Sequence, residues 1–91
     1  MQYCIDQEKI VWRNIEQEVI ILNLDSGFYY GLNKTAALVW TRLTEKKTSD
    51  EISQELAKEY GLTLKKAKED VLNAIQEFTK ESLVLLSKAS S

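Results

Sequence analysis

The segment LNLDSGFYYGLN, residues 22–33, predicts the hairpin around which the rest of the fold is arranged. Apolar and aromatic residues flank Asp25-Ser26-Gly27, and Gly27 readily takes the left-handed conformation that a short hairpin loop requires. We therefore expect a strand over Val19–Leu24 and a returning strand over Phe28–Leu32.

An earlier strand is predicted at Ile10–Trp12, which is β-branched and apolar. In the middle strand, Ile20, Leu22 and Leu24 share one face because they are spaced by two residues. The region from Lys9 to Leu32 thus predicts three antiparallel strands joined in sequence.

After residue 32 the spacing of apolar residues becomes that of helices. Asn33 is a suitable cap for a first helix to about Thr44. One face of this helix is apolar and contains Ala36, Val39, Trp40 and Leu43. Strands followed by helices predict an α+β fold, a winged helix-turn-helix with its three-stranded antiparallel sheet placed before three helices.

Capping signals delimit the other two helices. Thr48 and Glu51 form a capping box before the second helix, and Gly61 ends it. Thr63 caps a third helix to about Glu81. The apolar stripe of the third helix contains Ala67, Val71, Ala74, Ile75 and Phe78. The residues expected in the core, with no functional role, are Leu32, Trp40, Ile52, Leu56 and Val71.

Length and composition predict one domain over residues 1–91, with its core between about 9 and 86. Apolar residues make up 44% of the chain, yet the longest apolar run, Ala36–Trp40, is far too short to cross a membrane. We expect a cytoplasmic protein that contacts no membrane. The ends, before about Ile5 and after about Ser87, look free to fray, and Leu83–Leu86 is too short to assign.

The inventory of reactive side chains argues against an enzyme. The chain has no histidine and one cysteine, Cys4, so it offers no serine–histidine relay and no internal disulfide. Its three glycines form no phosphate-binding loop, and paired acids such as Asp50 and Glu51 point apart on a helix. We expect no catalytic residue, no metal and no cofactor.

DNA binding is the main alternative, because a helix pair leads into three lysines, Lys65, Lys66 and Lys68. Acidic residues oppose it, both on the same helix and around the hairpin that would serve as a wing. They are Glu69, Asp70, Glu77 and Glu81, and Glu16, Glu18 and Asp25. With twelve basic and fourteen acidic residues, the net charge of −2 gives no general attraction to nucleic acid, so we expect no nucleic-acid partner. A purely structural subunit is a third possibility.

Residues 22–43 resemble the signature of the PqqD-like proteins, small domains that bind the leader segment of ribosomally made peptide precursors. The resemblance is carried by Leu22-Asn23-Leu24, Gly27, Tyr30-Gly31-Leu32-Asn33, Thr35-Ala36, Trp40 and Leu43. It continues more loosely through Thr48, Ile52, Leu56, Tyr60, Val71, Phe78, Leu83 and Val84, so it covers roughly Lys9 to Leu86. Lys46-Lys47 and Ser82 stand where family members often have glycine.

The resemblance implies a peptide-recognition domain that takes up a leader as an added antiparallel strand beside the third strand and over the third helix. Free-standing members occur with the cofactor pathway that names the family and in lasso-peptide clusters. We therefore expect two partners: a precursor leader peptide and a separate maturation enzyme. The leader peptidase of a lasso-peptide pathway is the first candidate for that enzyme.

The predicted peptide site has a strand half and a helix half. The strand half is Phe28, Tyr29, Tyr30 and Gly31, because this edge is more apolar than a half-buried edge should be and invites another chain to pair. The helix half is Lys68, Leu72, Ile75 and Gln76. Leu72 is an apolar residue on a polar flank, so either the sheet covers it or it floors a pocket for the leader.

Overall fold

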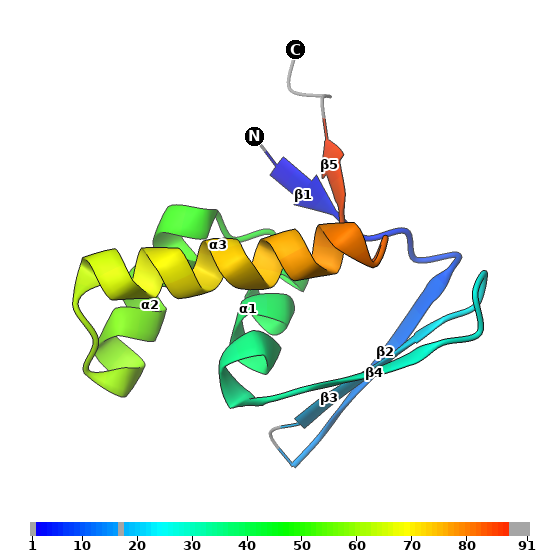
Figure 1. Ribbon diagram of the computed structural model, residues 1–91, viewed down its shortest axis with the longest axis horizontal. Helices are drawn as coiled ribbons and strands as arrows, with labels where there is room; N and C mark the ends of the chain where they lie inside the picture. The colour runs from blue at the N-terminus through cyan, green and yellow to red at the C-terminus, as the bar shows by residue number, and fades with distance from the viewer. Residues whose placement is uncertain (1, 17, 88–91) are drawn as a thin grey trace.

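The computed structural model describes residues 2–16 and 18–87 and shows a sheet followed by three helices, with a small second sheet near the chain ends (Figure 1). The elements are β1 (Gln2–Cys4), β2 (Ile10–Ile15), β3 (Glu18–Asn23), β4 (Tyr29–Leu32), α1 (Lys34–Thr44), α2 (Ser49–Tyr60), α3 (Leu64–Lys80) and β5 (Leu85–Ser87). The predicted α+β class and the order of strands and helices are confirmed.

The larger sheet has the order β2-β3-β4, and both pairs are antiparallel. Its inner face is formed in β3 by Val19, Ile21 and Asn23, which are buried. Ile20 and Leu24 are exposed, so the predicted face of Ile20, Leu22 and Leu24 is the outer one. Strand β2 continues to Ile15, three residues beyond the predicted strand, because the whole segment pairs with β3.

The hairpin between β3 and β4 is shaped by Gly27 and Asn23. Gly27 has φ +79°, which confirms the predicted left-handed residue. The buried Asn23 carboxamide accepts hydrogen bonds from the amides of Asp25 (2.9 Å) and Ser26 (3.3 Å). This side-chain turn satisfies loop amides and orients the chain for its return as β4.

All three predicted helix caps are confirmed. The Asn33 side chain accepts from the amide of Ala36 at 2.9 Å. Thr48 and Glu51 form both bonds of a capping box. Thr63 accepts from the amide of Lys66. Gly61, with φ +64°, ends α2 in the left-handed conformation. Local chemistry therefore determines where these helices begin and where α2 stops.

The core lies between the inner face of the sheet and the helices, with Trp40 of α1 at its centre. The Trp40 ring is fully buried and meets Trp12 and Phe78 edge-on, with ring centroids 6.3 and 5.3 Å away. The core prediction is confirmed for Trp40, Ile52, Leu56 and Val71, which are fully buried. Leu32 is half-buried and packs against the edge of this core.

The two ends of the described chain pair with each other, contrary to expectation. β1 and β5 are antiparallel, with Gln2 opposite Ser87 and Cys4 opposite Leu85. The prediction that residues before Ile5 fray is therefore wrong for Gln2–Cys4, and residues 88–91 lie outside the described ranges. Strands of three residues are too short to show a periodicity, and their partners lie at opposite ends of the sequence. None of the described helices is both long enough and apolar enough to cross a membrane.

Candidate functional site

Strand β4 is an edge strand of the larger sheet. It pairs with β3 on one side, and across residues 2–16 and 18–87 no strand pairs with its other side. The register places Tyr30 opposite Ile21 and Tyr29 opposite Leu22. The predicted strand edge is therefore present and accessible to another strand.

Two backbone hydrogen bonds show which groups of β4 point outward. The amide of Asn23 donates to the carbonyl of Phe28 at 3.0 Å, whereas the next amide, Leu24, donates to Lys9 on the other side of β3. Bonding directions alternate along an antiparallel strand, so Ile21 faces β4 and engages Tyr30. The N–H and C=O groups of Tyr29 and Gly31 consequently point away from the sheet and lack a strand partner in the described structure.

The side chains of β4 divide between the two faces of the sheet. Tyr29 shares the outer face with Leu22 and is 72% exposed, while Phe28 at the end of the hairpin is 64% exposed. Tyr30 lies on the inner face, half-buried against the core. Burial and the hydrogen bond to Glu81 raise the pKa of the Tyr30 hydroxyl. The edge therefore has an exposed Tyr29 on the outer face, an exposed Phe28 at its hairpin end, and a Tyr30 that is anchored inward.

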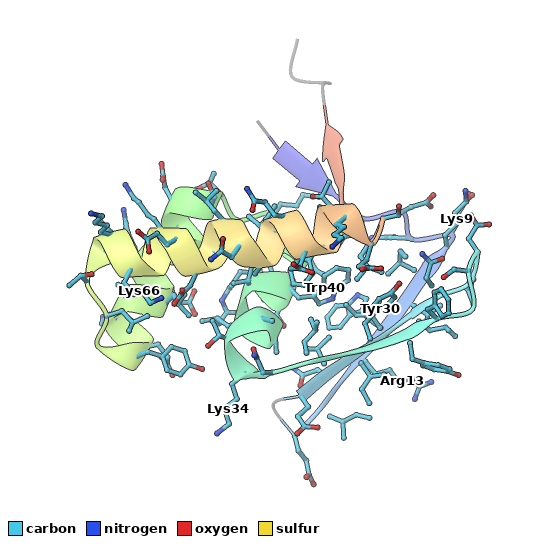
Figure 2. All side chains as sticks on the ribbon, viewed as in Figure 1. Lys9, Arg13, Tyr30, Lys34, Trp40 and Lys66 are labelled. Carbon is cyan, nitrogen blue, oxygen red and sulfur yellow. The ribbon has the colours of Figure 1, made fainter. Side chains whose placement is uncertain are left out.

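One hydrogen bond connects β4 to α3 and orients the helix relative to the edge. The Tyr30 hydroxyl donates to Oε2 of Glu81, the cap residue of α3, at 3.1 Å. Residues advance about 100° around an α-helix, so Glu77 and Ala74 share the flank of Glu81. Lys66 is on the same side of the helix, and Figure 2 shows it on the side of α3 toward β4. We call the surface of Ala74, Glu77 and Glu81 the β4-side flank.

The helix half of the predicted site lies elsewhere on α3. Leu72 precedes Glu81 by nine residues, or two and a half turns, so the two residues lie on opposite sides of the helix. It is 49% exposed, so the alternative that the sheet covers it is wrong. Lys68 and Gln76 are exposed on the same stripe. Ile75 is only 3% exposed and belongs to the core. The structure thus does not bring these four residues to the β4 edge.

An ion pair links α1 to α2, and a hollow lies beside it along α1. The guanidinium of Arg42 in α1 donates to Glu55 in α2 at 2.8 Å, and this contact raises the pKa of Arg42 and lowers that of the Glu55 carboxyl. A hollow of about 270 Å³ lies between β2, α1 and the end of α2, with Asn14, Lys34 and Tyr60 in its lining. Within the described ranges, no three cysteine, aspartate or glutamate side chains gather where they could hold a metal ion.

Sequence reasoning missed the structural roles of Asn23 and Glu81. Asparagine before a glycine-containing loop is a recognisable signal for a side-chain turn. Glu81 gave no such signal, because its contact with Tyr30 spans 51 residues. In the sequence Glu81 is only one of the acids that argue against DNA binding.

Two solved structures have the same fold as this chain. One is described as TbiB1 in complex with the TbiA(beta) leader peptide; it is 24% identical, has a TM-score of 0.83, and the match covers 100% of this chain and 99% of that one. The other is described as lasso peptide synthetase B1 complexed with the leader peptide, with 23% identity, a TM-score of 0.86, and coverage of 94% and 100%.

No curated protein matches the chain. The family model described as coenzyme PQQ synthesis protein D (PqqD) matches residues 18–84, from the start of β3 to the end of the buried core. This match takes in the sheet edge, the three helices and well over half of the sequence, so the chain belongs to the PqqD family.

Proposed function

We propose that this protein binds the leader segment of a ribosomally synthesised precursor peptide as a strand added to β4. The observation that carries the proposal is the pair of outward backbone positions, Tyr29 and Gly31, on an edge strand. Family membership supports it, as do the descriptions of two solved structures with this fold as complexes with leader peptides.

The recognition follows the chemistry of β-augmentation. A leader running antiparallel to β4 forms hydrogen bonds with the free N–H and C=O groups of Tyr29 and Gly31. Its side chains alternate between the outer face, beside the exposed ring of Tyr29, and the inner face, beside Tyr30. Backbone pairing supplies affinity for any strand, and the two faces supply selectivity.

The protein acts by binding and not by catalysis. Holding the leader raises the effective concentration of the attached precursor at a second protein. We propose that this second protein is a separate maturation enzyme, with the leader peptidase of a lasso-peptide pathway as the first candidate.

The strand half of the predicted site, Phe28 to Gly31, is central to this proposal. An added strand beside β4 meets the β4-side flank of α3 before it reaches Leu72. Contact between the leader and Lys68, Leu72 or Gln76, which the sequence predicts, requires the leader to cross to the far flank of α3. We expect the leader to stay on the β4-side flank instead. Ile75 is buried in the core, so it supports the helix and does not contact the leader directly.

A proline substitution tests the backbone pairing. Tyr29→Pro removes an outward amide that makes no bond within the sheet, so we expect a folded protein that no longer binds a fluorescein-labelled leader peptide. Tyr29→Ala is the matched control, because it removes the ring and keeps the amide. We expect it to retain binding that is weakened several-fold.

Circular dichroism establishes that both variants are folded, and fluorescence anisotropy gives the dissociation constants. Unchanged leader binding by a folded Tyr29→Pro protein would refute strand addition at this edge.

DNA binding stays the alternative function. The observations in its favour are the helix pair α2 and α3 and the exposed Lys65, Lys66 and Lys68. However, Lys66 is paired with Asp70 at 3.1 Å, which reduces the positive charge available to phosphate.

A further inference from the structure

We infer that charges at the two ends of the β4 edge select the direction and register of the leader. The preferred leader carries an acidic side chain near Lys34 and a basic one about four residues later, near Glu81. This inference rests on the proposed function, because it concerns the same edge strand.

The negative end of the edge is held in place by Tyr30. The Tyr30 hydroxyl donates to one oxygen of Glu81 and positions that carboxylate beside β4. A carboxylate has two oxygens and several acceptor positions, so a single neutral donor leaves most of them free. Glu77 lies one turn earlier on the same flank, and among the described residues neither Glu77 nor Glu81 forms an ion pair. A leader ammonium or guanidinium next to Tyr30 would donate to the free acceptor positions of Glu81.

The positive end is Lys34, the first residue of α1. It follows β4 by two residues and is exposed, and Figure 2 shows it at the opposite end of the strand from Tyr30. Glu59 lines the same hollow as Lys34, yet no described carboxylate comes within ion-pair distance of the Lys34 ammonium. Its charge is therefore available to a ligand at this end of the edge.

The distance between the two charges along the strand predicts the spacing of the charged residues in the leader. Tyr30 and Lys34 are four residues apart, about 13 Å along an extended chain at about 3.3 Å per residue. An antiparallel leader begins near the Lys34 end and finishes near the Tyr30 end. Its acidic residue therefore comes first, its basic residue follows about four positions later, and the even spacing puts both on one face.

The other charges of α3 do not compete for this role. Lys66 and Asp70 neutralise each other. Lys80 follows Glu77 by three residues but is rotated about 100° from Glu81 around the axis. Glu69 lies a third of a turn away from Glu81 and belongs to the exposed face of the helix.

The test is a charge scan of the leader. The probe is a fluorescein-labelled synthetic peptide with the leader sequence of the precursor gene adjacent to the gene for this chain. Each position is replaced in turn by lysine and by glutamate, and anisotropy gives each dissociation constant at low and high salt. We expect one position to prefer lysine by about fivefold, and a position about four residues earlier to prefer glutamate, with both preferences reduced by salt.

Charge reversals in the protein assign each preference to a residue. Glu81→Lys is expected to reverse the lysine preference alone, and Lys34→Glu the glutamate preference alone. Glu69→Lys and Lys58→Glu carry the same changes of charge at exposed positions away from the edge, and are expected to alter neither preference.

Several outcomes would overturn the inference. A lysine-preferring position that comes before the glutamate-preferring one contradicts the assigned direction, and preferences that survive both reversals contradict the assigned residues. A third outcome is that the leader binds the wild-type chain, does not bind Tyr29→Pro, and shows no charge preference at any position. That result contradicts the inference and still supports the proposed function. A leader that does not bind the wild-type chain removes both.

Discussion

Tyr30 links the edge strand to the end of the last helix. Its backbone pairs with Ile21, its ring packs against the core, and its hydroxyl reaches Glu81. Because bonding directions alternate along a strand, the backbone groups of its neighbours Tyr29 and Gly31 have no strand partner among residues 2–16 and 18–87. Of these three consecutive residues, Tyr30 bonds within the sheet, and Tyr29 and Gly31 present their backbone groups to a partner strand.

Leu72 provides a test of where the leader lies on α3. It is half-exposed and half a turn from Glu81, so we expect Leu72→Ala to change the leader dissociation constant by less than about twofold and stability by only about 0.5 kcal/mol. If Leu72 instead floors a pocket for the leader, the same substitution is expected to weaken binding by about tenfold, because a buried leucine contact is lost.

Ala74→Lys is the comparison, because it places a long charged side chain on the β4-side flank. We expect it to alter leader binding more than Leu72→Ala does. Isothermal titration and urea unfolding measure both effects. A tenfold loss on Leu72→Ala at unchanged stability would place the leader over the far flank of α3.

The capping box of α2 contributes to stability through two otherwise unpaired amides. Thr48 accepts from the amide of Glu51, and the Glu51 carboxylate accepts from the amide of Thr48, which also lowers the pKa of Glu51. We expect Thr48→Ala to lower the free energy of unfolding by about 1 kcal/mol. Gln54→Ala, at an exposed position within the same helix, is the control and should be near neutral. Equal urea midpoints for the two variants would contradict a role for the cap.

The Arg42–Glu55 ion pair joins α1 to α2 and makes stability depend on pH. The contact lowers the pKa of Glu55 in the folded state below that of a glutamate in an unfolded chain. A lowered folded pKa contributes stability above the unfolded value, and this contribution disappears as the pH falls through the folded pKa. Because both side chains are partly exposed, we expect a contribution below about 1 kcal/mol.

The prediction is that Glu55→Gln is less stable than the parent at pH 7 and that the difference shrinks toward pH 3. Urea unfolding across this range measures it. Glu69→Gln removes an acid that forms no ion pair within the described ranges, and it controls for the general loss of negative charge. A difference between Glu55→Gln and the parent that does not change with pH would exclude the ion pair as its cause.

The distribution of charge over the whole molecule separates peptide binding from DNA binding. Residues 1–32 hold five acids and two bases, and these residues form the sheet that would act as a wing. A protein that neutralises several phosphates loses orders of magnitude in duplex affinity between about 50 and 200 mM salt, whereas strand pairing with few charged contacts loses little.

We expect leader binding to weaken only a few-fold over this range, and no measurable binding to a random duplex near physiological salt. Anisotropy with labelled leader and labelled duplex under the same conditions measures both. Tight duplex binding with a steep salt dependence would favour the transcription-factor alternative.

Local chemistry in the sequence was sufficient to predict the hairpin glycine and the three helix caps. The pattern of apolar residues predicted the α+β class, and the spacing of matching residues carried the family resemblance. Asn33, Thr48, Thr63 and Gly61 act on amides or dihedral angles within a few residues of themselves, so their effects are readable from neighbouring letters. The edge strand was also predictable, because three strands joined in sequence by hairpins leave the third strand at the edge of the sheet.

Contacts between distant segments could be established only once the chain was folded. The pairing of β1 with β5 and the bond from Tyr30 to Glu81 join residues that are far apart in sequence. The rotation of α3 about its axis decides whether Leu72 or Glu81 faces the edge, and this rotation follows from how the helix packs over Trp40. A helical stripe shows which residues share a face, but packing against other elements determines what that face meets.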